Sequence, residues 1–200
     1  MIKERIDYEN LDIATPRQRE SIAELEQLNL GAQQIAEIIL VLLDLKPATE
    51  LLIFKHNDTP SHVQQVIEQT GLKVLPKPHE HKRNRQMTGI LLVSKNRDYN
   101  LELLFNDGQI DQPIAKQRRY GQLMGYPNTA IDAYCVGGQE LLPDQEEPNM
   151  AGIPFSMKLS RKGKDQELKL LQYWSKIIRK YAPTVYERAL PTDEQDKIDF

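Results

Sequence analysis

The sequence contains a single cysteine, Cys135, among 200 residues. One cysteine excludes an internal disulfide framework and a zinc site built from cysteines. The longest apolar run covers only residues 38–43, far short of the roughly 20 residues that a membrane span requires. The first ten residues, MIKERIDYEN, are charged where a secretory signal would have its apolar segment. We therefore expect a cytoplasmic protein with no membrane segment.

Familiar catalytic and nucleotide-binding motifs are also missing. There is no Gly-x-Ser-x-Gly nucleophile elbow, no Walker-type phosphate loop and no Gly-x-Gly-x-x-Gly after a strand. Aromatic residues make up 6% of the chain, and no aromatic-rich strand of the kind that stacks bases is present. The acidic balance, with a sequence pI of about 5.9, counts against nucleic-acid binding. The sequence indicates no cofactor.

Charge is unevenly distributed along the chain, although the net charge is only −3. Residues 73–119 hold 10 basic and 5 acidic side chains, and residues 158–188 hold 9 and 3. Residues 120–157 contain no lysine or arginine. If the two basic segments meet in space, they form a positive face suited to an anionic ligand. If they lie apart, each is a solvated surface.

Two threonine–proline pairs mark helix starts. Thr15 precedes Pro16 and Thr59 precedes Pro60; a threonine hydroxyl caps free N–H groups, and proline suits the first helical position. The first helix is expected to end at Gly31 and the other at Gly71. Between them, a helix from about Ala32 to Leu45 is apolar on almost every side, particularly over Ile35–Leu45. A buried strand over residues 38–43 is the alternative. We expect the helix to be buried in the core or shared in a homo-oligomer.

Strand patterns flank the helix that starts at Thr59. Residues 50–54 and 72–75 lie on either side of it, which predicts a βαβ unit with a parallel pair. Residues 89–94 and 99–105 predict a hairpin, and residues 155–159 resemble an edge strand.

Three further helices are expected after the hairpin. They cover residues 112–124, 128–134 and 164–181, and the last is strongly amphipathic. The predicted fold class is α+β, with α/β as the alternative. It is a short mixed sheet of about four to five strands packed by several helices, with an N-terminal helical pair and a long C-terminal amphipathic helix. We expect a single domain over residues 1–190 and a flexible acidic tail over residues 191–200.

A basic segment between two predicted strands is the first candidate ligand site. It concentrates cations and imidazoles, which bind phosphate or carboxylate, in Lys77, His79, His81, Lys82, Arg83 and Arg85, with Glu80 as the only acid among them. The alternative is a surface loop whose charges serve solubility. His79 and His81 point the same way in an extended chain, but further metal ligands are missing and the neighbouring cations oppose a divalent ion. We therefore predict no metal site.

The segment from residue 118 to residue 128 is the second candidate. Gly125 is expected to end one helix and Asn128 to cap the next, which explains the pattern structurally. The functional alternative is that the new helix start, with Arg118 and Arg119 upstream, binds an anion. Asp132 in the first turn weakens that possibility.

Three classes of function remain open. The first hypothesis is a binding protein for a small anionic ligand that carries phosphate or carboxylate. The second is a protein–protein interaction or homo-oligomeric module built on the helix over Ile35–Leu45. The third is an enzyme of unassigned reaction that uses His79, Glu80 and His81 for proton transfer beside the basic segment.

Overall fold

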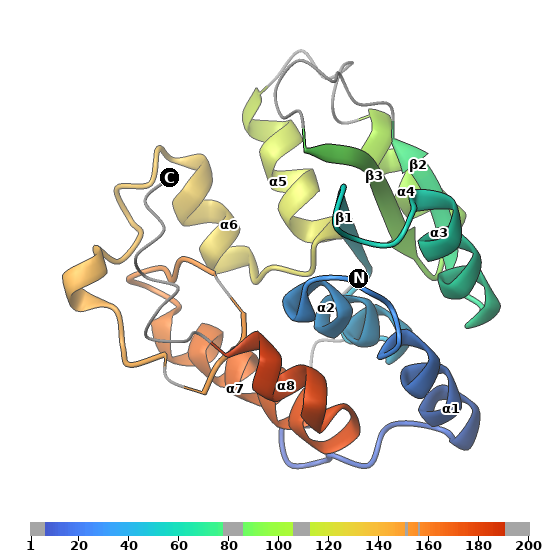
Figure 1. The fold of residues 1–200 in the computed structure, drawn as a ribbon. Helices are drawn as coiled ribbons and strands as arrows, with labels where there is room; N and C mark the ends of the chain where they lie inside the picture. The colour runs from blue at the N-terminus through green and yellow to red at the C-terminus, as the bar shows by residue number, and fades with distance from the viewer. Residues whose placement is uncertain (1–6, 78–85, 106–112, 151, 156, 191–200) are drawn as a thin grey trace.

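The computed structural model describes residues 7–77, 86–105, 113–150, 152–155 and 157–190 (Figure 1). All three strands lie before residue 95, between helices, and the elements described after them are helical. Their order is α1 (Pro16–Leu25), α2 (Ala32–Leu42), β1 (Ala48–Phe54), α3 (Pro60–Gln69), β2 (Lys73–Lys77), β3 (Met87–Ser94), α4 (Arg97–Phe105), α5 (Pro113–Leu123), α6 (Asn128–Cys135), a 3-10 turn (Asp144–Glu146), α7 (Lys164–Tyr181) and α8 (Pro183–Ala189). The fold is α+β.

The sheet has three strands in the order β1-β3-β2 within the described residues, fewer than the four to five expected. β3 lies between the other two and pairs antiparallel with both. The predicted parallel pairing of β1 with β2 is therefore wrong. β1 and β2 precede and follow α3 in the chain, and they run in the same direction because both are antiparallel to β3. They are not hydrogen-bonded to each other, since β3 lies between them.

Helices cover both faces of this sheet. Successive side chains of a strand point to opposite faces, so each face contributes its own set of apolar side chains. Leu51, Leu91 and Val93 face the main hydrophobic core, and α2 and α3 contact that side. Leu92 and Ala48 face a smaller cluster that contains residues of α4 and α5. Figure 1 shows α2 between the sheet and the pair α7–α8. The smaller cluster therefore joins the sheet to the helices that follow it.

α2 is buried as expected. Ile35, Ile38, Ile39, Leu40 and Val41 have no exposed surface within the single chain. Neighbouring helices and the sheet of the same chain cover this apolar surface. Its burial therefore requires no second copy.

Two predicted strands are wrong. Residues 97–105 form α4 instead of the second strand of a hairpin. Asn96 precedes this helix, and its side-chain oxygen accepts a hydrogen bond from the Asp98 N–H in the first turn at 2.9 Å. Residues 155–159 form no strand where described, although Leu141 and Ser160 make an isolated antiparallel bridge.

Helix starts agree well with the sequence, and helix ends agree less well. Thr15 caps α1, and its backbone N–H donates to the Gln18 side chain at 2.9 Å in a capping box. Thr59 caps α3. α1 ends at Leu25 instead of reaching Gly31, while α7 has the predicted bounds. No helix in the described part of the chain is both long and apolar enough to cross a membrane.

Candidate functional site

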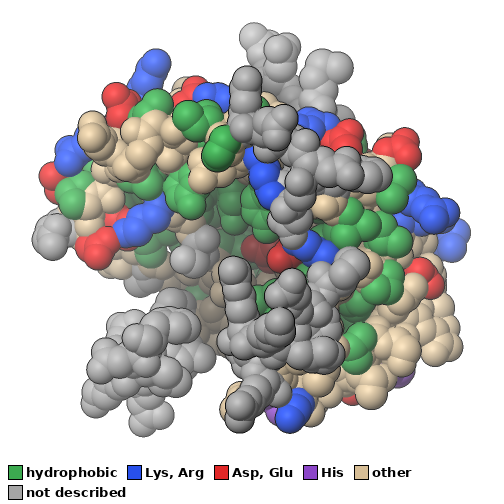
Figure 2. All heavy atoms as spheres, turned by 90° about the horizontal axis from the view of Figure 1, so that it is seen from above, with side chains coloured by type: hydrophobic (Ala, Val, Ile, Leu, Met, Phe, Trp, Pro, Cys, Tyr) green, Lys and Arg blue, Asp and Glu red, His purple; other side chains and the backbone are tan. Residues whose placement is uncertain are grey.

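A cavity of about 730 Å³ opens between α5, α6 and the segment that precedes α7. Its lining is mainly aromatic and aliphatic, with a few polar groups. The lining residues are Pro113, Lys116, Gln117, Tyr120, Gly121, Tyr126, Ala130, Ile131, Tyr134, Leu141, Met157 and Lys158. The view from above in Figure 2 shows hydrophobic side chains around a central hollow, with basic and acidic ones nearby. This size and composition are typical of a small-molecule site.

One face of α5 forms the first wall. Pro113, Lys116, Gln117 and Tyr120 follow the spacing that places residues on one side of a helix. At Gly121 the two helices approach so closely that an added β-carbon would lie 2.8 Å from Cγ1 of Ile131. Glycine at this position therefore lets α6 pack directly against α5.

The turn between α5 and α6 positions Tyr126 at the cavity. Gly125 has a φ of 76°, a conformation that glycine adopts without steric cost. The backbone N–H of Tyr126 then donates to the Gly121 carbonyl at 3.0 Å. Pro127 is the cap residue of α6, and Asn128 is its first residue and makes no cap hydrogen bond. The predicted capping role of Asn128 is wrong, since the cap falls one residue earlier.

Two chain segments pair to form the wall that carries Leu141, Met157 and Lys158. The Leu142 N–H donates to the Leu159 carbonyl at 2.8 Å, and the Arg161 N–H donates to the Glu140 carbonyl at 2.8 Å. Across the same pairing, Lys158 contacts the carboxylates of Asp144 and Glu147, the latter at 2.9 Å. These carboxylates raise the pKa of Lys158. The Lys158 ammonium is therefore charged and already paired.

A buried carboxylate fastens this wall to α6. Glu167 of α7 is fully buried and accepts hydrogen bonds from the Thr129 hydroxyl at 2.5 Å, the Ser160 hydroxyl at 2.6 Å and the Ser160 N–H at 2.6 Å. A β-carbon at Gly163 would collide with the Thr129 hydroxyl. Thr129 precedes the lining residue Ala130, and Ser160 lies two residues after the lining residue Lys158, so the hydrogen bonds of Glu167 link the two walls.

A second buried polar cluster lies behind Tyr126. The Lys46 side chain is only 1% exposed, and its ammonium lies 3.0 Å from Oε2 of Glu37. The same oxygen accepts from the Thr49 hydroxyl at 2.5 Å. The ammonium also lies 5.7 Å from the ring centroid of Tyr126 and 5.5 Å from that of Trp174. Burial, with the nearby Glu37 charge, raises the pKa of Tyr126 to about 12.

The predicted site residues that the structure describes do not meet in this cavity. Lys77 lies 3.2 Å from Oε2 of Glu50 across the sheet. Arg118 is paired with Asp132 and Arg119 with Glu102. Asn128 is exposed. His79, Glu80, His81, Lys82, Arg83 and Arg85 lie outside the described residues, as does the predicted tail over residues 191–200.

The cavity lysines were missed by the sequence reasoning. Lys116 comes from the first basic segment and Lys158 from the second, so the two segments do meet at a concave surface. The sequence feature that could have indicated this wall is the four-residue spacing of Lys116 and Tyr120, which places them on one side of a helix, followed by Gly121. Among the described residues, no group of three or more histidine, cysteine or acidic side chains is arranged to hold a metal ion.

Comparison of the chain with protein-family models, with curated proteins and with solved structures finds no match.

Proposed function

We propose that this protein binds a small organic anion in the cavity between α5 and α6. The observation that carries the proposal is a cavity of about 730 Å³ with aromatic and aliphatic walls and a half-buried cation, Lys116, on one wall. Apolar walls supply most of the contact area for a small ligand, and a few polar groups fix its orientation. A lysine ammonium favours a carboxylate or phosphate group.

Lys158, on the opposite wall, is paired with Asp144 and Glu147. Together with Lys116 it gives the described lining two lysines, which favour a ligand with an anionic group. The remaining lining favours an apolar or aromatic body attached to that group.

The proposal is tested by ligand-observed NMR with a panel of small carboxylates and phosphates, followed by titration of the hits. Lys116→Gln should weaken binding about tenfold or more, since a hydrogen bond to a charged group contributes roughly 1.5–3 kcal/mol. Lys176→Gln is the matched control. Lys176 is exposed on α7 and does not line the cavity, so this variant should bind like the unmodified protein.

Two results would contradict the proposal. One is that no carboxylate or phosphate in the panel binds. The other is that Lys116→Gln and Lys176→Gln weaken the bound acids equally, which would indicate a diffuse charge effect and no defined site.

A second candidate function, contact with another protein chain, is favoured by the apolar residues near the mouth. Ile114, Tyr134 and Val136 are 57%, 59% and 59% exposed, and the thiol of Cys135 donates to the Ile114 carbonyl at 3.7 Å, which places the three close together. Analytical ultracentrifugation of Ile114→Ser/Val136→Ser distinguishes the candidates. Loss of a self-associated species would support a protein contact.

A further inference from the structure

Exposed apolar side chains gather where α5 begins and α6 ends, at the opening of the cavity. The thiol of Cys135 donates to the Ile114 carbonyl at 3.7 Å, which brings the two helix ends together. Two of the exposed residues also line the cavity. We call this surface the mouth patch, and its members are Pro113, Ile114, Ala115, Tyr134 and Val136.

The mouth patch holds most of the large apolar side chains that the described part of the chain exposes. Four such side chains are exposed there, and three of them, Ile114, Tyr134 and Val136, are more than half exposed. The fourth, Leu52, lies on β1 and is 38% exposed. The first three residues of α5 are also consecutive, apolar and exposed. Such a run is unfavourable for solubility and is typical of a surface that binds another molecule.

An ion pair adjoins the mouth patch. Arg118 lies four residues after Ile114 on α5, which places the two side chains on one helix face. Asp132 lies four residues before Val136, and the Val136 N–H donates to its carbonyl at 3.1 Å, so this pair also shares a face. Arg118 and Asp132 contact each other, yet their side chains remain 43% and 56% exposed. A molecule that covers the patch therefore meets one positive and one negative group beside it.

We propose that the mouth patch binds a second copy of this chain in a two-fold symmetric dimer, in which Arg118 of each copy also pairs with Asp132 of the other. A two-fold axis places the same surface on both sides of the contact, so every contact is made twice. An apolar patch matches its own copy. A positive and a negative group side by side also match their own copy, because the axis exchanges their order.

This charge pattern favours a second copy over a strongly acidic or basic partner, which would find no net charge in the Arg118–Asp132 pair. The second copy borders the cavity opening, because Pro113 and Tyr134 belong to both the patch and the cavity lining. The inference names the partner for the second candidate function. It does not depend on the binding of a small anion.

Analytical ultracentrifugation of the full chain over a range of concentrations tests the dimer. The patch is small compared with the roughly 800 Å² per partner that a stable interface buries, so we expect a Kd of about 10–100 μM. Ile114→Ser/Val136→Ser should raise this Kd about tenfold or more, since it removes apolar contact area. Leu52→Ser is the matched control and should leave the Kd unchanged. All three side chains are exposed, so the variants should keep their melting temperatures.

Reversal of the two charges tests the two-fold arrangement. Arg118→Glu and Asp132→Lys each place like charges opposite each other across the dimer, so each variant alone should show a Kd about tenfold or more above that of the unmodified chain. An equal mixture of the two variants should dimerise about as tightly as the unmodified chain, because each introduced charge then meets an opposite charge. The pair within each chain stays broken in the mixture, so recovery can come only from pairing between copies.

Three results would overturn the inference. A chain that is monomeric at every concentration has no second copy on the patch, and flotation of that monomer with phosphatidylcholine vesicles would assign the patch to a lipid surface. A dimer that Ile114→Ser/Val136→Ser leaves intact uses another surface. A mixture of the charge variants that stays monomeric excludes the two-fold pairing. Titration with small acids measures the cavity separately, so failure there would reject the proposed function and leave the dimer.

Discussion

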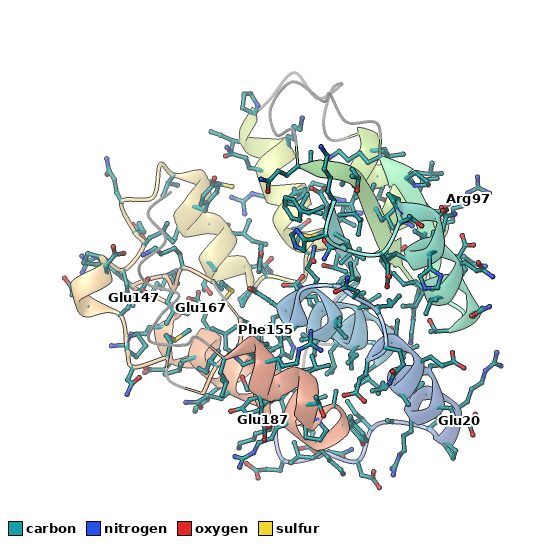
Figure 3. The ribbon with its side chains drawn as sticks, in the orientation of Figure 1. Glu20, Arg97, Glu147, Phe155, Glu167 and Glu187 are labelled. Atoms are coloured by element: carbon teal, nitrogen blue, oxygen red, sulfur yellow. The ribbon has the colours of Figure 1, made fainter. Side chains whose placement is uncertain are left out.

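Glu167 shows how a single residue can fix the shape of the cavity. Figure 3 labels it where α6 and α7 meet. Its carboxylate accepts three hydrogen bonds from Thr129 and Ser160, and it is fully buried. Unpaired buried polar groups are costly, so the carboxylate and its donors depend on one another.

We expect Glu167→Ala to lower the free energy of unfolding by about 3 kcal/mol. The change leaves two hydroxyls and one backbone N–H without their acceptor, and each buried unsatisfied group costs roughly 1–3 kcal/mol. Urea denaturation followed by circular dichroism measures the loss. Glu187→Ala is the control, because Glu187 is exposed on α8, and it should change stability by less than about 0.5 kcal/mol. A Glu167→Ala variant as stable as the control would show that the hydrogen-bonded cluster is not structural.

The partners of the buried polar residues were the least predictable feature from the sequence. No residue next to Glu167 in the sequence indicates that its side chain is buried, because its hydrogen-bond partners lie in other segments. Lys46 likewise resembles an ordinary surface lysine until the fold places Glu37, Tyr126 and Trp174 around it. Long-range partners of a charged residue have no local signature.

Among whole elements, those with a strong local signal were predicted well. The capping residues Thr15 and Thr59 specified two helix starts, and the apolar face of α7 defined that helix over its full length. α4 was missed because its short sequence alternates like a strand. Tertiary contacts decide its conformation: Leu103 packs in the smaller hydrophobic cluster, and the Asn100 side chain donates to the Lys73 carbonyl at 3.0 Å. The strand order could not be predicted from the sequence either, because β3 inserts between two strands that precede it in the chain.

The burial of α2 leads to a prediction about the stability of the chain. Leu42 is 4% exposed, and aspartate there would place an unpaired carboxylate in the core. We expect Leu42→Asp to destabilise the chain by about 4 kcal/mol or more, so that it unfolds at room temperature or precipitates. Gln33→Asp, on the exposed side of the same helix, should remain folded because a carboxylate near a helix start is favourable. A folded Leu42→Asp variant with unchanged melting temperature would contradict the observed burial.

At the scale of the whole molecule, several of the described cations pair with acids from other segments. Arg119 pairs with Glu102, Arg118 with Asp132 and Lys180 with Asp12 at 3.4 Å. Solvated ion pairs add little stability. Lys116 and Lys158, one from each basic segment, both line the cavity, which supports the site proposed for a small anion.

The basic segment over residues 77–85 is the competing hypothesis for the ligand site, and binding experiments can distinguish it from the cavity. If the cavity holds the ligand, Lys82→Gln/Arg83→Gln/Arg85→Gln should leave the affinity for a small organic acid unchanged, whereas Lys116→Gln reduces it. Solvent-exposed charges are screened over roughly 8 Å at physiological ionic strength, so binding that depends on such charges alone should fade as salt rises. Binding at the half-buried Lys116 should weaken less, because its ligand is also held by apolar walls. Titrations of both variants at low and high salt measure this, with heparin and phosphate as the polyanion and inorganic probes. If the triple variant loses the acid and Lys116→Gln keeps it, the ligand site belongs to the basic segment.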